Sequence, residues 1–171
     1  MKRRHAWIIA SSLSLLAGAA SAQVDHGRFL RSSLKAQSAQ LAARAAQTYA
    51  KGPHKFGDAI YDLEAPHWVT PATYIGVMRP LAPDERRYVV SYFKSMKVEQ
   101  AAKAFDKAML FQADGHNYWL PVEAPIVPYF ARELKRGQKI DLYVVQPGGT
   151  RRSSGWEWLF LVEDFQAADG G

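Results

Sequence analysis

The chain of 171 residues contains no cysteine. This absence excludes disulfide bonds, cysteine nucleophiles, thiolate metal sites and a lipidated N-terminal cysteine. The Gly-x-Ser-x-Gly motif of many hydrolases is also missing, as are the phosphate-loop and dinucleotide-binding motifs. Packing alone must therefore stabilise the fold, and we predict no cofactor.

The first 22 residues have the three parts of a cleaved secretory signal. Basic residues at positions 2–4 precede an apolar run that begins near Trp7, and Ala-Ser-Ala stands at 20–22. The apolar run is shorter than the roughly 20 residues that a membrane-spanning helix needs, so we favour cleavage over an uncleaved anchor. We expect cleavage after Ala22 and export of a soluble mature chain, without a transmembrane anchor, to a periplasm or to the extracellular space.

Loss of this signal changes the charge balance. The precursor has 22 lysines and arginines against 16 aspartates and glutamates, a formal charge of +6. Three basic residues and no acidic residue lie in the signal, so the mature chain keeps 19 basic against 16 acidic residues, a charge of +3. So small a charge does not favour a nucleic-acid partner. The length that remains suits one domain with a sizeable core.

Residues 23–71 are predicted to form an N-terminal helix and an irregular connection. From His26 to Ala50, apolar residues recur at spacings near three, four and seven, which predicts an alanine-rich amphipathic helix. Its apolar face is mostly alanine and has little affinity for a membrane, so we expect the helix to dock on the domain. The segment 51–72 carries three prolines and no sustained period, which is typical of a connection.

Residues 72–166 are predicted to form the core domain, and 167–171 a disordered tail. Asp114-Gly115 is the strongest hairpin signal in the chain. Over this region the apolar period changes repeatedly between that of strands and that of helices. The predicted elements are a strand at 72–78, a helical region at 81–105, strands at 107–113 and 117–123, a short helix at 128–137, and strands at 139–147 and 156–165.

The helical region at 81–105 carries a large aromatic stripe. Helical apolar stripes usually face a core, so we expect this one to pack against a sheet rather than to line a binding groove. The stripe consists of Tyr88, Val89, Tyr92, Phe93 and Met96.

The order of these elements predicts an α+β fold. If the helical region is an insertion, three strands, a helix and two strands remain, an order that resembles five-stranded OB-type barrels. The resemblance lies in element order alone. We therefore predict a small, partly open OB-like β-barrel or a five-stranded sheet, with the N-terminal helix and the inserted helix packed on it.

The segment Gly155–Phe165, "GWEWLFLVEDF", raises the question of whether its aromatic row faces a ligand or a core. Trp156, Trp158, Phe160 and Val162 share one parity, and Leu159 and Leu161 lie on the other, so both faces are apolar in mid-strand. A ligand-facing row would more typically alternate with polar residues, so we predict that the row fills a core.

Two constellations of residues are candidates for a catalytic or a metal site. Ser-x-x-Lys occurs at Ser32–Lys35 and at Ser91–Lys94, but without the partner motifs of penicillin-binding enzymes. Acids and histidines also cluster in the connection, where Pro66 argues against a helical pair of ligands. We therefore predict no catalytic residue and no metal site. The residues of the second constellation are His54, Asp58, Asp62, Glu64 and His67.

The missing catalytic motifs favour a non-catalytic binding or scaffolding module of the cell envelope, with an anionic ligand or an envelope protein as its partner. Arg151 and Arg152 lie in "GGTRRSSG", a predicted flexible loop between the last two strands, and Arg132 and Arg136 add charge. In OB-type barrels this loop contacts ligands, and guanidinium groups recognise carboxylate and phosphate. An ordinary solvated loop is the alternative reading of the same residues.

Two other functions remain open. The first is hydrolysis of an envelope polysaccharide by a pair of carboxylates that the sequence does not single out among its acids. The second is an assembly subunit that pairs through its N-terminal helix. The oligomeric state does not follow from the sequence.

Overall fold

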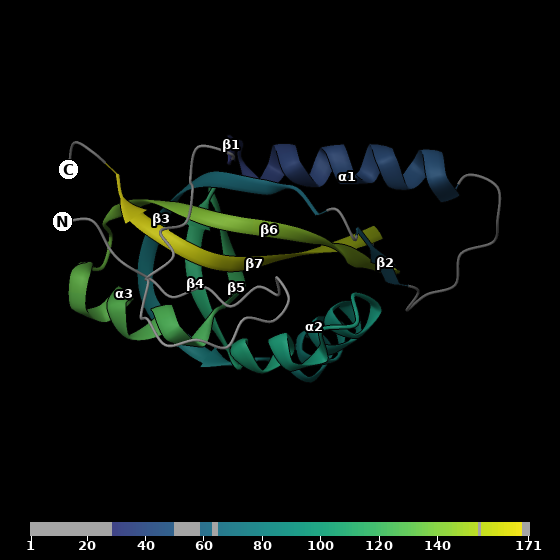
Figure 1. Cartoon of the computed structure of the whole chain (residues 1–171). Helices are drawn as coiled ribbons and strands as arrows, with labels where there is room; N and C mark the ends of the chain where they lie inside the picture. The colour runs from purple at the N-terminus through teal and green to yellow at the C-terminus, as the bar shows by residue number, and fades with distance from the viewer. Residues whose placement is uncertain (1–28, 50–58, 63–64, 154, 169–171) are drawn as a thin grey trace.

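The computed structural model describes residues 29–49, 59–62, 65–153 and 155–168 and has an α+β fold (Figure 1). The predicted fold class is confirmed at this level. The predicted signal lies outside the described residues. In chain order the elements are β1 (Leu30–Arg31), α1 (Leu34–Tyr49), β2 (Ala59–Tyr61), β3 (His67–Pro80), α2 (Pro83–Ser95), η2 (Glu99–Ala104), β4 (Lys107–Ala113), β5 (His116–Val122), η3 (Ala124–Ile126), α3 (Val127–Glu133), β6 (Lys139–Arg152) and β7 (Gly155–Ala167).

The seven strands form one mixed sheet with the order β1-β3-β4-β5-β7-β6-β2. The first half of β3 runs antiparallel to β6, and its second half runs antiparallel to β4. The β1–β3 and β5–β7 pairs are parallel. In the view of Figure 1, α1 lies along one side of the strands, and α2 and α3 lie along the opposite side.

Two apolar clusters hold the fold together. The larger one contains Phe111, Phe130 and Phe165, with the rings of Phe130 and Phe165 stacked at a centroid distance of 3.8 Å. The second cluster lies between α2 and the sheet and includes Leu161 of β7. The aromatic stripe of α2 faces this second cluster, as predicted: its first four members are buried and Met96 is partly buried.

The N-terminal helix docks on the domain as predicted, although it begins later than expected. Ser33 precedes the first turn, and its Oγ accepts a hydrogen bond from the Ala36 N–H at 3.1 Å, a typical N-terminal cap. Leu34, Leu41 and Ala45 are buried on one face. Because that face packs on the domain, the apolar stripe of α1 is already covered along most of its length.

The segment predicted as a flexible loop at 148–155 is largely strand, so that prediction was wrong. Gly148 to Arg152 pair with Leu159 to Gly155 of β7, and the edge strand β2 pairs with the same stretch of β6 from its other side. Gly148 has a φ of 130°, and a side chain there would overlap the carbonyl oxygen of Ile60. Gly148, which suggested a loop, instead allows β2 to approach β6 closely, and Gly149 leaves room for the Trp158 ring of β7.

Candidate functional site

Strand β7 carries two buried acidic residues where its pairing with β6 changes register. Tyr143 of β6 lies opposite Asp164, and Val144 lies opposite Val162, so Glu163 is an extra residue at a β-bulge. Only 4% of Glu163 and 5% of Asp164 is exposed. Bulges redirect side chains and are frequent beside functional sites. Carboxylates this deeply buried need partners, because desolvation disfavours their charge.

His67, the first residue of β3, is the partner of Glu163. Its Nδ1 lies 3.2 Å from Glu163 Oε2. The hydrogen bond with Glu163 raises the pKa of His67, and burial partly opposes that rise. Burial raises the pKa of Glu163, and His67 partly offsets the increase. The ring of Phe29 packs edge-on against His67 at a centroid distance of 5.1 Å and helps to fix the imidazole.

A third carboxyl group, that of Glu123, interacts electrostatically with Glu163 and Asp164. Glu123 follows β5, and its backbone N–H donates a hydrogen bond to the Val162 carbonyl at 3.0 Å, which holds it beside the bulge. Burial raises the pKa of Glu123 from 4.5 to about 7, with smaller contributions from Glu163 and Asp164. A carboxyl group with this pKa exchanges a proton near neutral pH.

The pKa of Tyr92 of α2 is also raised. Burial, followed by the charges of Glu163 and Asp62, raises its pKa to about 12. We define the carboxylate cluster as the ionisable residues around the bulge: His67, Tyr92, Glu123, Glu163 and Asp164. Glu123 is the member that can hold and release a proton near neutral pH.

The aromatic row of β7 divides between core and surface. Phe160 and Val162 are buried in the larger cluster, whereas Trp158 is partly buried and packs against that cluster's edge. The core prediction is therefore confirmed for Phe160 and Val162 and only in part for Trp158. Trp156 and Trp158 stack with a centroid distance of 5.5 Å and an interplanar angle of 19°.

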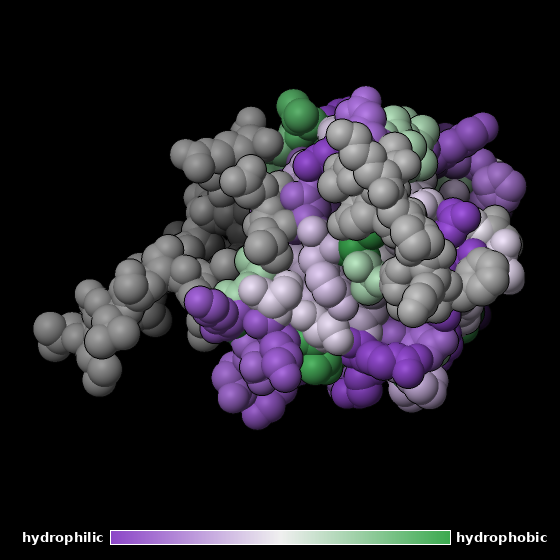
Figure 2. Space-filling view, turned by 90° about the vertical axis from the view of Figure 1, so that its right-hand side faces the viewer, coloured by the Kyte–Doolittle hydropathy of each residue, from purple (hydrophilic) through white to green (hydrophobic). Residues whose placement is uncertain are grey.

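Arg151 and Arg152 end β6 beside this tryptophan pair. The guanidinium of Arg151 lies over the Trp156 ring, 5.7 Å from its centroid. Arg152 Nε donates to Glu157 at 2.6 Å, and its Nη2 donates to Asp84 at 3.3 Å. The charge of Arg152 is thus balanced by two carboxylates, whereas that of Arg151 lies on an aromatic face. Figure 2 views this end of the molecule and shows residues of intermediate hydropathy between strongly hydrophilic ones.

Arg132 and Arg136 lie near the opposite end of β6 and are not brought together with Arg151 and Arg152. The intervening strand has 14 residues, a path on the order of 40 Å. The guanidinium of Arg132 stacks over Tyr129 at 4.2 Å and donates to Glu133 at 3.0 Å. The Arg136 side chain packs against Gly76. The four arginines therefore do not form one site.

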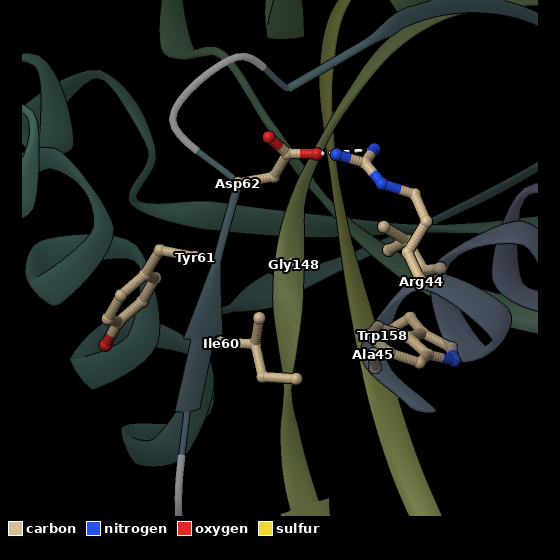
Figure 3. A pocket seen from close by; sticks show the side chains of 8 residues that line it. Arg44, Ala45, Ile60, Tyr61, Asp62, Gly148 and Trp158 are labelled. Carbon is tan, nitrogen blue, oxygen red and sulfur yellow. Dashed lines mark ion pairs between the residues drawn. The ribbon is translucent and has the colours of Figure 1, made fainter. Parts of the chain in front are cut away.

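A small pocket lies beneath α1, between β2 and the β6–β7 hairpin (Figure 3). Its volume is about 100 Å³. Arg44 of α1 and Asp62, which follows β2, form an ion pair of 2.8 Å at this pocket. The lining residues are Leu41, Arg44, Ala45, Ile60, Tyr61, Asp62, Gly148 and Trp158.

Of the predicted connection cluster, His54, Asp58 and Glu64 lie outside the described residues. Asp62 and His67 separate, since Asp62 pairs with Arg44 and His67 with Glu163. Within the described ranges, no group of three or more histidines and acids is arranged to hold a metal ion.

Sequence reasoning missed both the carboxylate cluster and the pocket. One signal for the first was present, since Glu163 and Asp164 interrupt an apolar strand that is buried on both faces. The pocket had no such signal, because its residues come from α1, β2, β6 and β7 and only tertiary packing unites them.

In the part of the molecule that the structure describes, none of the helices combines the length and the apolar character needed to cross a bilayer. The chain matches no family model, no curated protein and no solved structure.

Proposed function

We propose that the protein is an exported, non-catalytic binding module with an OB-like core, and that its β6–β7 hairpin end contacts the ligand. The pairings β3–β4, β4–β5, β5–β7, β7–β6 and β6–β3 support the OB-like description, since each of the five strands has two neighbours. The parallel β5–β7 pair and the position of α3 between β5 and β6 fit the same description. In such barrels the loop between the last two strands commonly contacts ligands.

One observation carries this proposal: the stacked Trp156–Trp158 pair, with Arg151 over one face. Stacked, partly exposed rings provide a rigid surface for a planar or ring-shaped group. An adjacent guanidinium attracts carboxylate or phosphate. The combination suits an anionic ligand with rings, such as an acidic polysaccharide of the cell envelope.

Affinity electrophoresis in a gel that contains an acidic polysaccharide tests this proposal. Arg151→Ala is expected to weaken retention about two- to fivefold, the effect of one exposed charged contact, with little change in melting temperature. Arg86→Ala removes the same charge from an exposed position of α2 and serves as the control. Equal losses in the two variants would mean that net charge alone governs retention and would overturn the proposal.

Export after cleavage at Ala22 remains part of the proposal, supported by the three-part pattern of residues 1–22. N-terminal sequencing of the mature protein tests it. A chain that begins at Gln23 is expected, and one that begins at Met1 in washed membranes would contradict it.

The carboxylate cluster favours a second candidate, hydrolysis of an envelope polysaccharide. Glu123, with its pKa raised to about 7 by burial and by neighbouring carboxylates, has the property of a general acid, and Glu163 supplies a second carboxyl group. In a reducing-end release assay, Glu123→Gln is expected to lower kcat at least about 100-fold. Glu99→Gln, an exposed acid of η2, is the control. An absence of turnover in the wild type would rule this candidate out.

The assembly alternative receives less support, because Leu34, Leu41 and Ala45 of α1 are buried and are not available to a partner helix. Light scattering over a range of concentrations tests it. A mass that rises with concentration would restore this alternative.

A further inference from the structure

The pocket beneath α1 contains an ion pair whose two members differ in their surroundings. Asp62 has 13% of its side chain exposed, whereas Arg44 has 60% exposed. The backbone N–H of Asp62 donates to the Pro147 carbonyl at 2.9 Å, which anchors the residue to β6. Arg44 reaches Asp62 from α1 on a long side chain, as Figure 3 shows. The carboxylate is therefore the fixed group, and the guanidinium is the group that can be exchanged.

The walls of the pocket suit a cation with an apolar body. The side chain of Ile60 points toward β6, and the indole of Trp158 forms the wall on the side of β7 (Figure 3). Aromatic faces attract cations, and indole does so most strongly. Tyr61 also lines the pocket, but its ring points away from Trp158 and packs on Tyr88 at a centroid distance of 5.2 Å, as part of the second cluster.

The charges discriminate between cationic and anionic ligands. An anion that captured Arg44 would leave the largely buried Asp62 carboxylate without that cation, which is costly. A cation that displaced Arg44 would keep Asp62 paired, and the released guanidinium would be solvated because it is already mostly exposed. Arg44 therefore occupies the position on Asp62 that the cationic group of a ligand would take.

We propose that this pocket binds the guanidinium, amidinium or ammonium end of a small ligand, which replaces Arg44 on Asp62 and packs its apolar body between Ile60 and Trp158. The inference goes beyond the proposed hairpin site, since it uses a carboxylate rather than Arg151 and selects the opposite charge. A volume of about 100 Å³ fits one such group with a small ring, so the pocket takes the end of a molecule.

Benzamidine, benzoate and benzamide test the inference, because the three probes share a planar shape and differ in charge. Binding is followed by tryptophan fluorescence and by titration calorimetry on the mature protein. Benzamidine is expected to bind the wild type, and Arg44→Ala is expected to raise its affinity about two- to fivefold by removing the competing guanidinium. Asp62→Asn is expected to lower the affinity at least about tenfold.

Arg31→Ala is a closely matched control for Arg44→Ala. Arg31 forms a 2.8 Å ion pair with Asp141, and its side chain is 61% exposed, so the geometry and the loss of charge are similar at a distant position. This variant is expected to leave benzamidine affinity unchanged.

Several results would overturn the inference. They are an absence of benzamidine binding, benzoate binding that Arg44→Ala abolishes, and equal benzamidine affinity in the wild type and Asp62→Asn. If Asp62→Asn does not fold, Asp62→Ser and the Arg44→Ala titration decide the matter, and unchanged benzamidine affinity in Arg44→Ala then counts against the inference. Loss of polysaccharide retention in Arg151→Ala would not affect this result, so failure of the pocket and failure of the hairpin site are distinguishable.

Discussion

Replacing Glu123 by glutamine is expected to make the protein more stable above neutral pH. Burial, with the charges of Glu163 and Asp164, raises the pKa of Glu123 from 4.5 to about 7. Between these two values the folded chain binds more protons than the unfolded chain, so stability falls as the pH rises through this window. Glutamine has nearly the same shape and no charge, so Glu123→Gln removes this loss.

The size of the effect follows from the pKa change. If the whole pKa change contributed, the free energy of unfolding of the protein would fall by about 3 kcal/mol between pH 4 and pH 8. Glu123 keeps partial contact with water, which screens its neighbours, so we expect about 1 to 2 kcal/mol. The wild type and the variant should have similar stability at pH 4, where Glu123 is protonated.

Urea unfolding at pH 4, 6 and 8, followed by tryptophan fluorescence, measures this difference. The pKa of His67 is raised, so its ion pair with Glu163 contributes stability below pH 6.5 that is lost as the pH rises through its higher folded value. That contribution is present in both proteins and cancels in the comparison. Equal pH dependence in the wild type and Glu123→Gln would refute the proposed burial of a titrating carboxyl group.

Three further predictions concern the packing. Gly148→Ala is expected to cost at least about 2 kcal/mol more than Gly155→Ala in urea unfolding, because both glycines have a φ near 130° but only Gly148 lies against the β2 backbone. Phe160→Ala is expected to cost about 3 to 5 kcal/mol and Trp158→Ala less, since only Phe160 is fully buried, and the reverse order would contradict the division of the aromatic row. Phe130→Ala, which removes a fully buried ring stacked on a second one, should also lose about 3 to 5 kcal/mol, and a neutral effect on the melting temperature would be inconsistent with this core.

Much of the fold could be predicted from the sequence because turns, helix starts and amphipathic stripes depend on residues that are close together in the chain. Asp114 and Gly115 both adopt positive φ, of 52° and 78°, as a two-residue hairpin turn requires, and the strands on either side of them lie close to their predicted bounds. Pro83 stands at the start of α2, where its fixed φ suits the first turn. The stripe of α2 was predictable because an amphipathic helix must bury its apolar face.

The functional candidates were less predictable because they depend on contacts between distant residues. The raised pKa of Glu123 depends first on its burial in the folded chain and then on Glu163 and Asp164 of β7, some forty positions later in the sequence. The pocket pairs Arg44 with Asp62 across segments that the sequence describes only as a helix and a connection. At Gly148, local composition suggested a loop, whereas pairing with both β2 and β7 determined a strand.

The bulge at Glu163 also changes which residues of β7 face the core. Before it, the even-numbered Phe160 and Val162 face the larger cluster, and after it the odd-numbered Phe165 faces the same cluster. Because Glu163 is the extra residue, deleting it would leave Val162, Asp164 and Phe165 in the regular alternation of a strand, with Phe165 still facing the larger cluster. The bulge therefore places a buried carboxyl group beside His67 without changing which of the later side chains face the core, whereas deleting a residue of the strand outside the bulge would exchange its two faces.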